Sequence, residues 1–272
     1  MTADPSVRNS PSAAFAAHAH AAAIDDQFTR QAERFAQATE LHNDAVLSLL
    51  VEAAAPQASD ELLDIACGPG SVVATFAPAV RRAIGLDATE AMLDEARALA
   101  KAGGLRNVEW RRGDVYALPF GDGDFDIVTC RFAFHHFKHP ARAFAEMVRV
   151  CRSGGRILLC DAVASDDPAK AAAFNAMEKR RDPSTVAMRP LGFLSALFAE
   201  ARMPVSQMRH FQIRYEREAL IGKSFPVGGD RAGLRCMIDE AVAEDRMGMG
   251  ARRDGDRVEI GYPSVILVAK KP

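Results

Sequence analysis

The sequence predicts an α/β fold in which a mostly parallel sheet is covered by helices on both faces. Short segments that are apolar almost throughout, such as 61–67, 82–88 and 156–163, alternate with longer segments whose apolar residues recur at helical spacing. Strands of a parallel sheet are buried on both faces, so they form continuous apolar runs. Glycine and proline residues separate the segments, as expected for the loops between them. The alternation therefore predicts βαβ units.

The order of the elements follows from the same patterns. Helices are expected at 24–55, because Phe28, Ala32 and Phe35 share one face, and Pro56 ends this region. Strands are expected at 61–67, 82–88, 107–114, within 121–134, and at 156–163, 208–216 and 263–271. Further helices are expected at 71–80, 90–102, 140–152, 166–197 and 225–244. Thr89 is expected to be the N-cap of the helix at 90–102.

The composition is that of a globular protein and argues against several other classes. The chain has 272 residues, of which 49% are hydrophobic and 26% charged, and its formal net charge is −2. Basic pairs are scattered rather than concentrated in one stripe, so no nucleic acid partner is expected. The sequence has no run of about 18 apolar residues, so no membrane span is expected either.

The cysteines and the N-terminus indicate a cytoplasmic protein. The five cysteines form no CxxC pair, which is typical of free thiols in a reducing compartment. Metal ligands do not cluster at short spacing, so no metal site is expected. The N-terminus lacks the basic start and apolar core of a secretory signal, and residues 1–23 are expected to form a disordered tail.

The stretch LLDIACGPGS, residues 62–71, is the first indication of a binding site. It leads from an apolar strand directly into Gly68 and Gly70, which allow positive φ and leave the backbone uncovered. A ligand can then lie on the backbone amides at the N-terminus of the next helix. Glycine turns after strands also occur for packing reasons. The residues at the ends of the neighbouring strands are needed to distinguish a ligand-binding turn from a packing turn.

Acidic residues end the next two strands. Asp87 lies nineteen positions after Gly68, where a carboxylate can accept hydrogen bonds from both hydroxyls of a ribose. The alternative is that Asp87 only interacts with the dipole of the following helix. Asp114 ends the third strand, where it could accept from the exocyclic amine of an adenine, with Val115 and Met92 beside the ring.

Two observations favour an adenosyl cofactor over a nicotinamide dinucleotide. The turn reads Gly68-x-Gly70-x-x-Val73, so the third glycine of the dinucleotide fingerprint is missing. The contact expected from Asp114 also comes too early in the chain for a ligand with a pyrophosphate. An adenosyl compound without pyrophosphate is therefore favoured.

Five ordered segments carry a resemblance to a known family. They are LLDIACGPG (62–70), AIGLDATEAML (83–93), GDVYALPFGDGDFDIVTCRFAFHHF (113–137), EMVRVCRSGGRILLCD (146–161) and EKRRDPST (178–185). Together they resemble the class I S-adenosylmethionine-dependent methyltransferases, in particular the ubiquinone/menaquinone C-methyltransferase-like (type 11) group. The resemblance implies a Rossmann-like sheet of seven strands, mostly parallel with an antiparallel last strand, with N-terminal lid helices and a helical cap.

The resemblance also divides the chain and assigns residues to the cofactor. It implies one domain at 24–272, made of N-terminal helices (24–55), a cofactor-binding core (60–163), a cap insertion (164–225) and a C-terminal helix and strand (226–272). The implied cofactor is S-adenosyl-L-methionine, with S-adenosyl-L-homocysteine as product. Carried over by position, the cofactor-binding residues are Asp64, Ala66, Gly68, Gly70, Asp87, Ala88, Met92, Asp114, Val115 and Arg131. Many relatives carry Gly where Ala66 stands, so this loop is expected to be slightly less free.

Candidate residues for the acceptor side follow the fourth and fifth strands. The sulfonium methyl group is already activated, so the main tasks of the enzyme are alignment and exclusion of water. A base helps where the acceptor is a hydroxyl or an enolic carbon, and His136 and His135 are the candidates, with Asp161 as a second choice. The alternative for all three is a structural role as a helix cap or in packing.

Two further segments are assigned to the acceptor. Phe28, Gln31 and Phe35 resemble the lid helix of the family, although apolar residues at helical spacing are also common in plain core. Arg181 in the cap is expected either to pair with Asp182 or to meet an anionic or phenolic acceptor.

The sequence therefore predicts an enzyme that methylates a small, aromatic or quinone-like molecule at carbon or oxygen. One alternative is a methyltransferase fold that binds S-adenosylmethionine for a non-methylating reaction or for regulation. A further alternative is a nicotinamide-dependent oxidoreductase. Methylation of nucleic acid is disfavoured, because RFAFHHF stands after the fourth strand in place of an Asn-Pro-Pro-aromatic element.

Overall fold

The computed structural model describes residues 27–29, 32 and 44–272. The tail predicted at 1–23 therefore lies outside the described residues. The strands are β1 (Glu61–Ile65), β2 (Arg82–Asp87), β3 (Val108–Arg112), β4 (Phe125–Arg131), β5 (Cys151–Ala164), β6 (Arg189–Pro190), β7 (Val205–Glu216), β8 (Arg252–Asp254) and β9 (Arg257–Lys270). The α-helices are α2 (Asp44–Ala54), α3 (Ser71–Phe76), α4 (Glu90–Ala102), α5 (Pro140–Val150), α6 (Pro168–Arg181), α7 (Leu191–Glu200), α8 (Arg217–Lys223) and α9 (Arg231–Val242). Short 3-10 helices are η2 (Ala77–Ala79), η3 (Phe134–His136) and η4 (Val227–Gly229).

The sheet confirms the predicted fold class. Its strands lie in the order β3-β2-β1-β4-β5-β9-β7, with β6 paired to β5 and β8 paired to β9. Strands β1 to β5 pair in parallel, whereas β9 runs antiparallel to both β5 and β7. The predicted path of seven strands is present, and its antiparallel member is β9. The order reverses between β1 and β4, which is where parallel sheets of this kind bind ligands.

The central strands are buried on both faces, which explains their continuous apolar sequence. On β5, Ile157 and Leu159 join an apolar cluster with α5 and α7. The intervening Leu158 and Cys160 join a second cluster, with α2, α3 and α4. Successive side chains of a strand point to opposite faces, so each face of β5 needs its own apolar residues.

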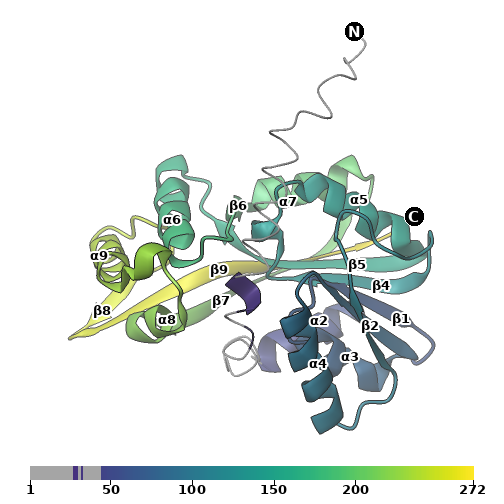
Figure 1. The fold of residues 1–272 in the computed structure, drawn as a ribbon. Helices are drawn as coiled ribbons and strands as arrows, with labels where there is room; N and C mark the ends of the chain where they lie inside the picture. Colours follow the sequence, from purple (N-terminus) through teal and green to yellow (C-terminus); the bar gives the residue numbers. More distant parts are fainter. Residues whose placement is uncertain (1–26, 30–31, 33–43) are drawn as a thin grey trace, which may run out of the picture.

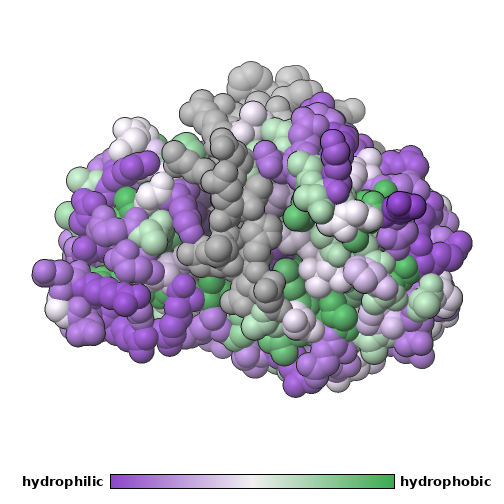
Figure 2. Space-filling view, turned by 90° about the horizontal axis from the view of Figure 1, so that it is seen from below, coloured by the Kyte–Doolittle hydropathy of each residue, from purple (hydrophilic) through white to green (hydrophobic). Residues whose placement is uncertain are grey.

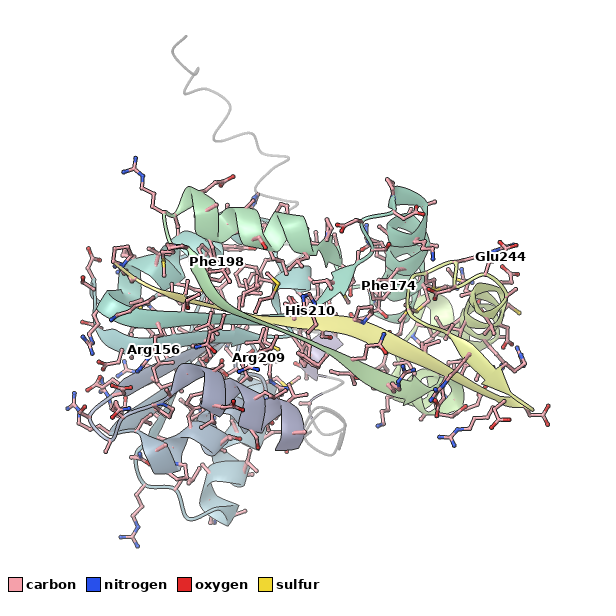
Figure 3. All side chains as sticks on the ribbon, turned by 180° about the vertical axis from the view of Figure 1, so that it is seen from behind. Arg156, Phe174, Phe198, Arg209, His210 and Glu244 are labelled. Atoms are coloured by element: carbon pink, nitrogen blue, oxygen red, sulfur yellow. The ribbon has the colours of Figure 1, made fainter. Side chains whose placement is uncertain are left out.

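Strands β7 and β9 extend beyond the sheet into a second lobe (Figure 1). This second lobe consists of α6, α8, α9, β8 and the paired residues 211–216 and 257–263. Its apolar cluster is separate from the two clusters of the main sheet and includes Phe174 and Tyr262. Figure 3 marks Phe174 in this lobe and Phe198 in the main lobe. Phe198 packs there against Phe144, with ring centroids 4.6 Å apart.

Residues 164–225, predicted to be a cap, are divided between the two lobes. Helix α6 belongs to the second lobe, whereas α7 packs on the main sheet and β7 is one of its strands. The helix predicted at 166–197 is therefore two helices, because the chain crosses between the lobes at residues 182–190. Helix α8 was not predicted, and β9 begins at Arg257 rather than at Pro263.

Charged residues cover the second lobe. Figure 2 shows mainly hydrophilic residues over this lobe, on the left of the view. Arg235 lies 2.7 Å from Glu218, and Arg252 lies 2.5 Å from Glu259. Such exposed pairs contribute about 0–1 kcal/mol each, so they keep the surface polar rather than hold the lobe together. Among the helices that the structure describes, none is both long and apolar enough to cross a membrane.

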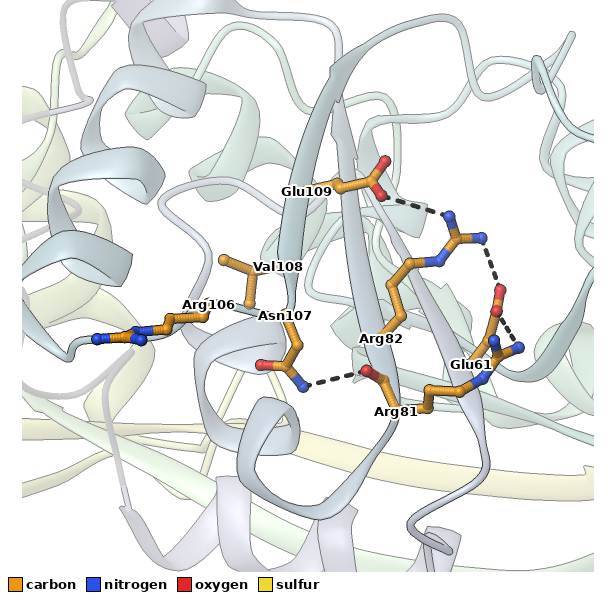
Figure 4. A pocket seen from close by; sticks show the side chains of 7 residues that line it. All are labelled: Glu61, Arg81, Arg82, Arg106, Asn107, Val108 and Glu109. Carbon is orange, nitrogen blue, oxygen red and sulfur yellow. Dashed lines mark hydrogen bonds and ion pairs between the residues drawn. The ribbon is translucent and has the colours of Figure 1, made fainter.

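A charged hollow of about 350 Å³ lies at the amino ends of β1, β2 and β3 (Figure 4). Within it, Arg82 lies 2.6 Å from Glu61 and 3.3 Å from Glu109. Arg81 also pairs with Glu61, so both glutamates of this hollow are bound by arginines of the protein itself. Parallel sheets bind ligands at the opposite, carboxyl ends of their strands, so the functional site is expected there.

Candidate active site

The loop after β1 and the end of β2 are joined by the carboxylate of Asp87. The backbone N–H of Gly68 donates to Asp87 Oδ2 at 2.9 Å, and the N–H of Thr89 donates to Oδ1 at 2.9 Å. Thr89 is the N-cap of α4 by position, but its side chain makes no capping hydrogen bond. Asp87 therefore holds the glycine loop and the start of α4 together. Each carboxylate oxygen keeps a further lone pair that can accept from a ligand.

The two glycines of the loop have different surroundings. Gly68 has φ +52°, and a Cβ atom placed on it would meet nothing within 4 Å among the residues that the structure describes. Gly70 has φ +85°, and a Cβ atom there would lie 2.5 Å from Trp110 Cη2 and 2.9 Å from Ala96 Cβ. The space beside Gly68 is thus open to a ligand, whereas the space beside Gly70 is filled by the protein. Sequence reasoning had given both glycines the same role and had not considered Trp110.

Asp64 lies beneath this loop in a buried position. Its Oδ1 accepts from Thr129 Oγ1 on β4 at 2.6 Å, and the residue is 1% exposed. Burial raises the pKa of Asp64 to about 7, although the Thr129 hydrogen bond and the charge of Arg131 act in the opposite direction. Asp64 thus links β1 to β4 at the point where the strand order reverses.

The residues expected at the adenine end differ in exposure. Ala88 and Asp114 are exposed, and Asp114 Oδ1 accepts from the backbone N–H of Tyr116 at 2.9 Å. Val115 is 9% exposed and Met92 only 2%. Ala88 and Asp114 are therefore accessible to a ligand, while Met92 supports the site from within the protein.

Arg131 at the end of β4 has an unsatisfied guanidinium nitrogen. Its Nη1 is buried and has no hydrogen-bond partner among the residues that the structure describes. The guanidinium carbon lies 5.1 Å from the ring centroid of Phe132, which has φ +52°. A left-handed conformation is uncommon for a bulky residue and often marks a functional site. Ala66, directly after β1, also has a left-handed φ of +51°.

These residues fit the adenosyl cofactor that the sequence implies. Open space beside Gly68 allows a ligand to approach the backbone. Asp87 stands at the position from which a carboxylate binds ribose hydroxyls. The orphaned Nη1 of Arg131 requires an acceptor, which a cofactor carboxylate would supply.

His135 forms an ion-pair dyad with Asp161. His135 Nδ1 lies 2.7 Å from Asp161 Oδ1, and the backbone N–H of His135 donates to Oδ2 at 3.0 Å. Burial opposes the charge of His135, but the Asp161 carboxylate outweighs it and raises the pKa of the imidazole above its ordinary value. Asp161 therefore anchors η3 to β5, and His135 is held by it rather than available as a base.

His136 has a different set of neighbours. Its Nδ1 lies 3.0 Å from Ser184 Oγ, which in turn lies 2.5 Å from Asp182 Oδ1. His136, Ser184 and Asp182 are 6%, 1% and 2% exposed. Burial, followed by the charge of His135, lowers the pKa of His136 to about 3. The ring is therefore neutral at physiological pH.

Arg181 pairs with Glu178. The pair with Asp182 that the sequence had suggested does not form. Its guanidinium contacts both carboxylate oxygens of Glu178, with Nη2 2.8 Å from Oε2, and Tyr262 donates to Oε1 of the same carboxylate. The i,i+3 spacing of Glu178 and Arg181 on one helix was a signal for this pair. Asp182 is thereby left to bind Ser184.

The N-terminal segment touches the site through Phe28. The ring of Phe28 meets that of His136 edge-on, with centroids 5.0 Å apart. Gln31 and Phe35, assigned to the same lid, lie outside the described residues. Two buried polar atoms, Gln27 Nε2 and Thr185 Oγ1, have no hydrogen-bond partner in the part of the chain that the structure describes. Gln27 precedes Phe28 in the sequence, and Thr185 follows Ser184.

Comparisons with known proteins point to one family. A family model for the methyltransferase domain matches residues 63–159. YcgJ of Bacillus subtilis (strain 168), an uncharacterized methyltransferase, is 32% identical over 194 residues, which cover 71% of this chain and 77% of YcgJ. The crystal structure of YcgJ matches with a TM-score of 0.75 and 29% identity, over 83% of this chain and 97% of that one.

Two further matches extend this result. A Bacillus halodurans C-125 crystal structure, described as that of a methyltransferase, matches with a TM-score of 0.76 and 31% identity, over 83% of this chain and 98% of that one. The ubiquinone/menaquinone biosynthesis C-methyltransferase UbiE of Roseobacter denitrificans is 36% identical over 124 residues. That match covers 44% of this chain and 50% of UbiE, so it spans about half of the relative's length.

Proposed function

Since the chain belongs to the methyltransferase domain family and its cofactor is S-adenosylmethionine, we propose that it methylates a small aromatic or quinone-like acceptor next to His136. Membership in this family rules out the nicotinamide-dependent oxidoreductase that the sequence had left as an alternative. The acceptor, the site residues and their roles are the subject of the proposal.

The chemistry asks little of the protein beyond placement. When bound, S-adenosylmethionine would supply an electrophilic methyl group on a sulfonium sulfur, which is the leaving group. Asp87 would bind the ribose, the backbone at Gly68 would lie along the methionine part, and Arg131 would bind the methionine carboxylate. Our candidate to receive the proton that the acceptor loses is His136.

The observation that carries the proposal is the pair of buried histidines at the carboxyl ends of β4 and β5. Their ring centroids lie 4.1 Å apart, yet their partners differ, because Asp161 binds His135 and Ser184 binds His136. The pKa of His135 is raised, whereas burial lowers that of His136 to about 3, so the His136 ring is neutral at physiological pH. Only a neutral imidazole can accept a proton from an acceptor, so we assign this role to His136.

The surroundings of His136 support an acceptor that is aromatic and also polar. The Phe28 ring covers one side of His136. Buried polar atoms normally have partners, and Gln27 Nε2 and Thr185 Oγ1 have none among the described residues. A flat ring carrying hydroxyl or carbonyl groups would satisfy both requirements. The partial likeness to UbiE, a quinone-pathway methyltransferase by its name, is in line with this chemistry.

The cofactor part is tested by calorimetric titration with S-adenosylhomocysteine. We expect micromolar binding, about −8 kcal/mol, to the wild type. Asp87→Ala should weaken binding by at least about tenfold, because it removes the ribose acceptor and releases Gly68. Asp94→Ala, an exposed carboxylate on α4, should bind like the wild type. Equal affinity in all three proteins would remove Asp87 from the site.

The acceptor part is tested by incubating the protein with S-adenosylmethionine and a panel of phenols, catechols and hydroquinones, with cyclohexanol as the aliphatic control. Methylated products are detected by mass spectrometry. We expect methylation of at least one aromatic compound, none of cyclohexanol, and loss of turnover in His136→Gln with S-adenosylhomocysteine affinity retained. Binding of the cofactor product without methylation of any aromatic compound would contradict this acceptor class.

A further inference from the structure

Phe132 leaves the face of the sheet on which the strand pattern would place it. Successive side chains of a strand point to opposite faces, so Phe132 would follow Val128 and Cys130 into the apolar cluster with α5 and α7 if β4 simply continued. Instead, the backbone of Phe132 turns into the left-handed region, with φ +52°. Its ring packs against the cluster on the opposite face, which includes Ile127, and against the cluster of the second lobe. The turn therefore places the ring on the same face as Arg131.

This turn brings the ring of Phe132 next to the guanidinium of Arg131. The guanidinium carbon lies over the ring, 5.1 Å from its centroid, and a cation and an aromatic face attract each other within about 6 Å. Consecutive residues of a regular strand could not make this contact, because their side chains would lie on opposite faces. A left-handed conformation is unfavourable for a bulky residue and persists only where the surrounding structure enforces it. The contact therefore depends on the conformation of Phe132.

Two contacts hold Phe132 in this conformation. Its backbone N–H donates to the carbonyl of Cys160 on β5 at 2.7 Å. Its ring meets the ring of Phe211 on β7 edge-on, with centroids 6.3 Å apart. Phe211, like Phe132, packs against the apolar clusters of both lobes. The main sheet thus fixes the backbone of Phe132 and β7 fixes its ring, so that the aromatic face beside Arg131 has a defined position.

Arg131 carries a buried charge that lacks a full counter-charge. Burial lowers the pKa of the guanidinium, but arginine stays protonated in proteins. Asp64 lies near enough to stabilise this charge, yet burial raises the pKa of Asp64 to about 7, so Asp64 is not a fully ionised partner at neutral pH. The buried Nη1 of Arg131 has no hydrogen-bond partner in the described part of the chain. An anionic group of a ligand would supply both the charge and the acceptor.

We propose that Phe132 is a positioning residue that holds the guanidinium of Arg131 toward the methionine carboxylate of the cofactor. This inference rests on the proposed function, which assigns that carboxylate to Arg131, and deepens it by naming the residue that orders the guanidinium. The ring of Phe132 confines the guanidinium on one side before the ligand arrives. A long arginine side chain loses rotational freedom when it is immobilised, so a guanidinium that is already ordered binds the carboxylate more tightly.

The test compares S-adenosylhomocysteine with 5′-methylthioadenosine, which keeps the adenosyl group and the sulfur but lacks the carboxylate. Calorimetric titration of the full chain with each ligand gives the preference, defined as the ratio of the two dissociation constants. We expect Arg131→Gln to lower the preference for S-adenosylhomocysteine about tenfold or more. Phe132→Leu should lower it about fivefold or more. Neither variant should change the affinity for 5′-methylthioadenosine, whereas a general loss of packing would weaken both ligands.

Two further variants serve as controls. Phe132→Tyr keeps the aromatic ring and should retain the preference of the wild type. In a protein that already carries Arg131→Gln there is no guanidinium to position, so the addition of Phe132→Leu should not change the preference further. Phe132→Gly also removes the ring and suits the left-handed backbone, so it takes the place of Phe132→Leu should that variant not fold.

The outcomes separate this inference from the proposed function. If Phe132→Leu kept the full preference, or weakened both ligands equally, while Arg131→Gln lost the preference, the positioning role would be overturned and the role of Arg131 would stand. If Arg131→Gln kept the preference, the guanidinium would not bind the carboxylate, and the inference would fail together with that role. If the wild type bound no S-adenosylhomocysteine, the proposed function itself would fail.

Discussion

At the scale of single residues, the glycine loop shows how one motif serves two purposes. Gly68 and Gly70 both have positive φ, yet only Gly68 borders open space. Gly70 makes room for Trp110, which packs the start of α3 against β3. Backbone freedom is needed at both positions, for packing at Gly70 and, in our proposal, for a ligand at Gly68.

Replacing each glycine by alanine should separate these purposes. Gly70→Ala places Cβ against Trp110 and should lower the free energy of unfolding by about 2–3 kcal/mol. Gly68→Ala introduces backbone strain but no steric overlap with the described residues, so it should lower the free energy of unfolding by only about 1 kcal/mol. It should nevertheless weaken S-adenosylhomocysteine binding by about tenfold or more, because Cβ enters the ligand space. Urea denaturation and calorimetric titration of both variants check this, and equal losses in both properties would contradict it.

Asp64 makes stability depend on pH in a predictable direction. Burial raises the pKa of Asp64 to about 7 in the folded protein, against 3.8 for an unperturbed aspartate carboxyl group. Between these values the folded state binds a proton that the unfolded state releases, so stability falls as pH rises from about 4 to about 7. Above pH 7 both states are ionised and the loss is complete.

The variant Asp64→Asn should lack this dependence. The difference in unfolding free energy between wild type and variant should fall by up to about 1.4 kcal/mol per pH unit across that window. Denaturant titrations at pH 4, 5, 6 and 7, chosen to span the window, measure the difference. If the difference in unfolding free energy between wild type and variant stayed constant or rose with pH, the pKa of Asp64 would not be raised in the folded protein.

At the scale of elements, the end of α6 is anchored by a buried cluster. Glu178 is 0% exposed and accepts from both Arg181 and Tyr262, the latter on β9. Tyr262→Phe should lower the free energy of unfolding by about 1.5–3 kcal/mol, because a hydrogen bond to a charged group is lost.

The control for this prediction is Tyr116→Phe. The hydroxyl of Tyr116 only accepts from the backbone N–H of His139 at 3.3 Å in an exposed position, so its loss should cost less than about 0.5 kcal/mol. Thermal or urea unfolding compares the two variants. Equal losses would mean that Arg181 alone satisfies Glu178.

The elements differ in how well they could be predicted, and burial explains the difference. Strands β1, β2 and β5 are buried on both faces, so their continuous apolar sequence identified them. The outer half of β9 and the edge strand β7 are only partly buried, and their pairing depends on residues far away in the chain. Helices α6 and α7 were merged because the crossing between the lobes leaves no sequence signal beyond Pro183 and Pro190.

The contacts of the candidate site also differ in how well the sequence predicts them. The spacing of Gly68 and Asp87 in a βαβ unit indicated that they lie together. In the structure, the backbone nitrogen of Gly68 lies 2.9 Å from Asp87 Oδ2. Ser184 is separated from His136 by 48 residues, and no local pattern could have linked them. Contacts made within one βαβ unit were predictable, whereas those between the sheet and the turn after α6 were not.

At the scale of the whole molecule, the two lobes should differ in local stability. In the second lobe, residues 211–216 pair only with β9, and such narrow ribbons are marginal without helices packed on them. The segment 157–160 in the main lobe is paired on both sides and buried on both faces. We therefore expect hydrogen exchange at 213–216 and 258–262 to proceed through openings of lower free energy than at 157–160.

Native-state hydrogen exchange with and without S-adenosylhomocysteine tests this expectation. The ligand should increase protection mainly in β1, β2 and β4, because the contacts that we propose for it lie at the carboxyl ends of these strands. If amides of both lobes exchanged with the same free energy of opening, and the ligand protected both lobes equally, the molecule would unfold as a single cooperative unit.

The position of β9 also affects how the protein forms during synthesis. Residues 264–270 of β9 lie between β5 and β7 in the finished sheet, although they are made after both. Until they leave the ribosome, the inner edges of β5 and β7 have no partner, and unpaired edges of this kind invite pairing with other chains. Completion of the sheet must therefore wait until β9 has been made.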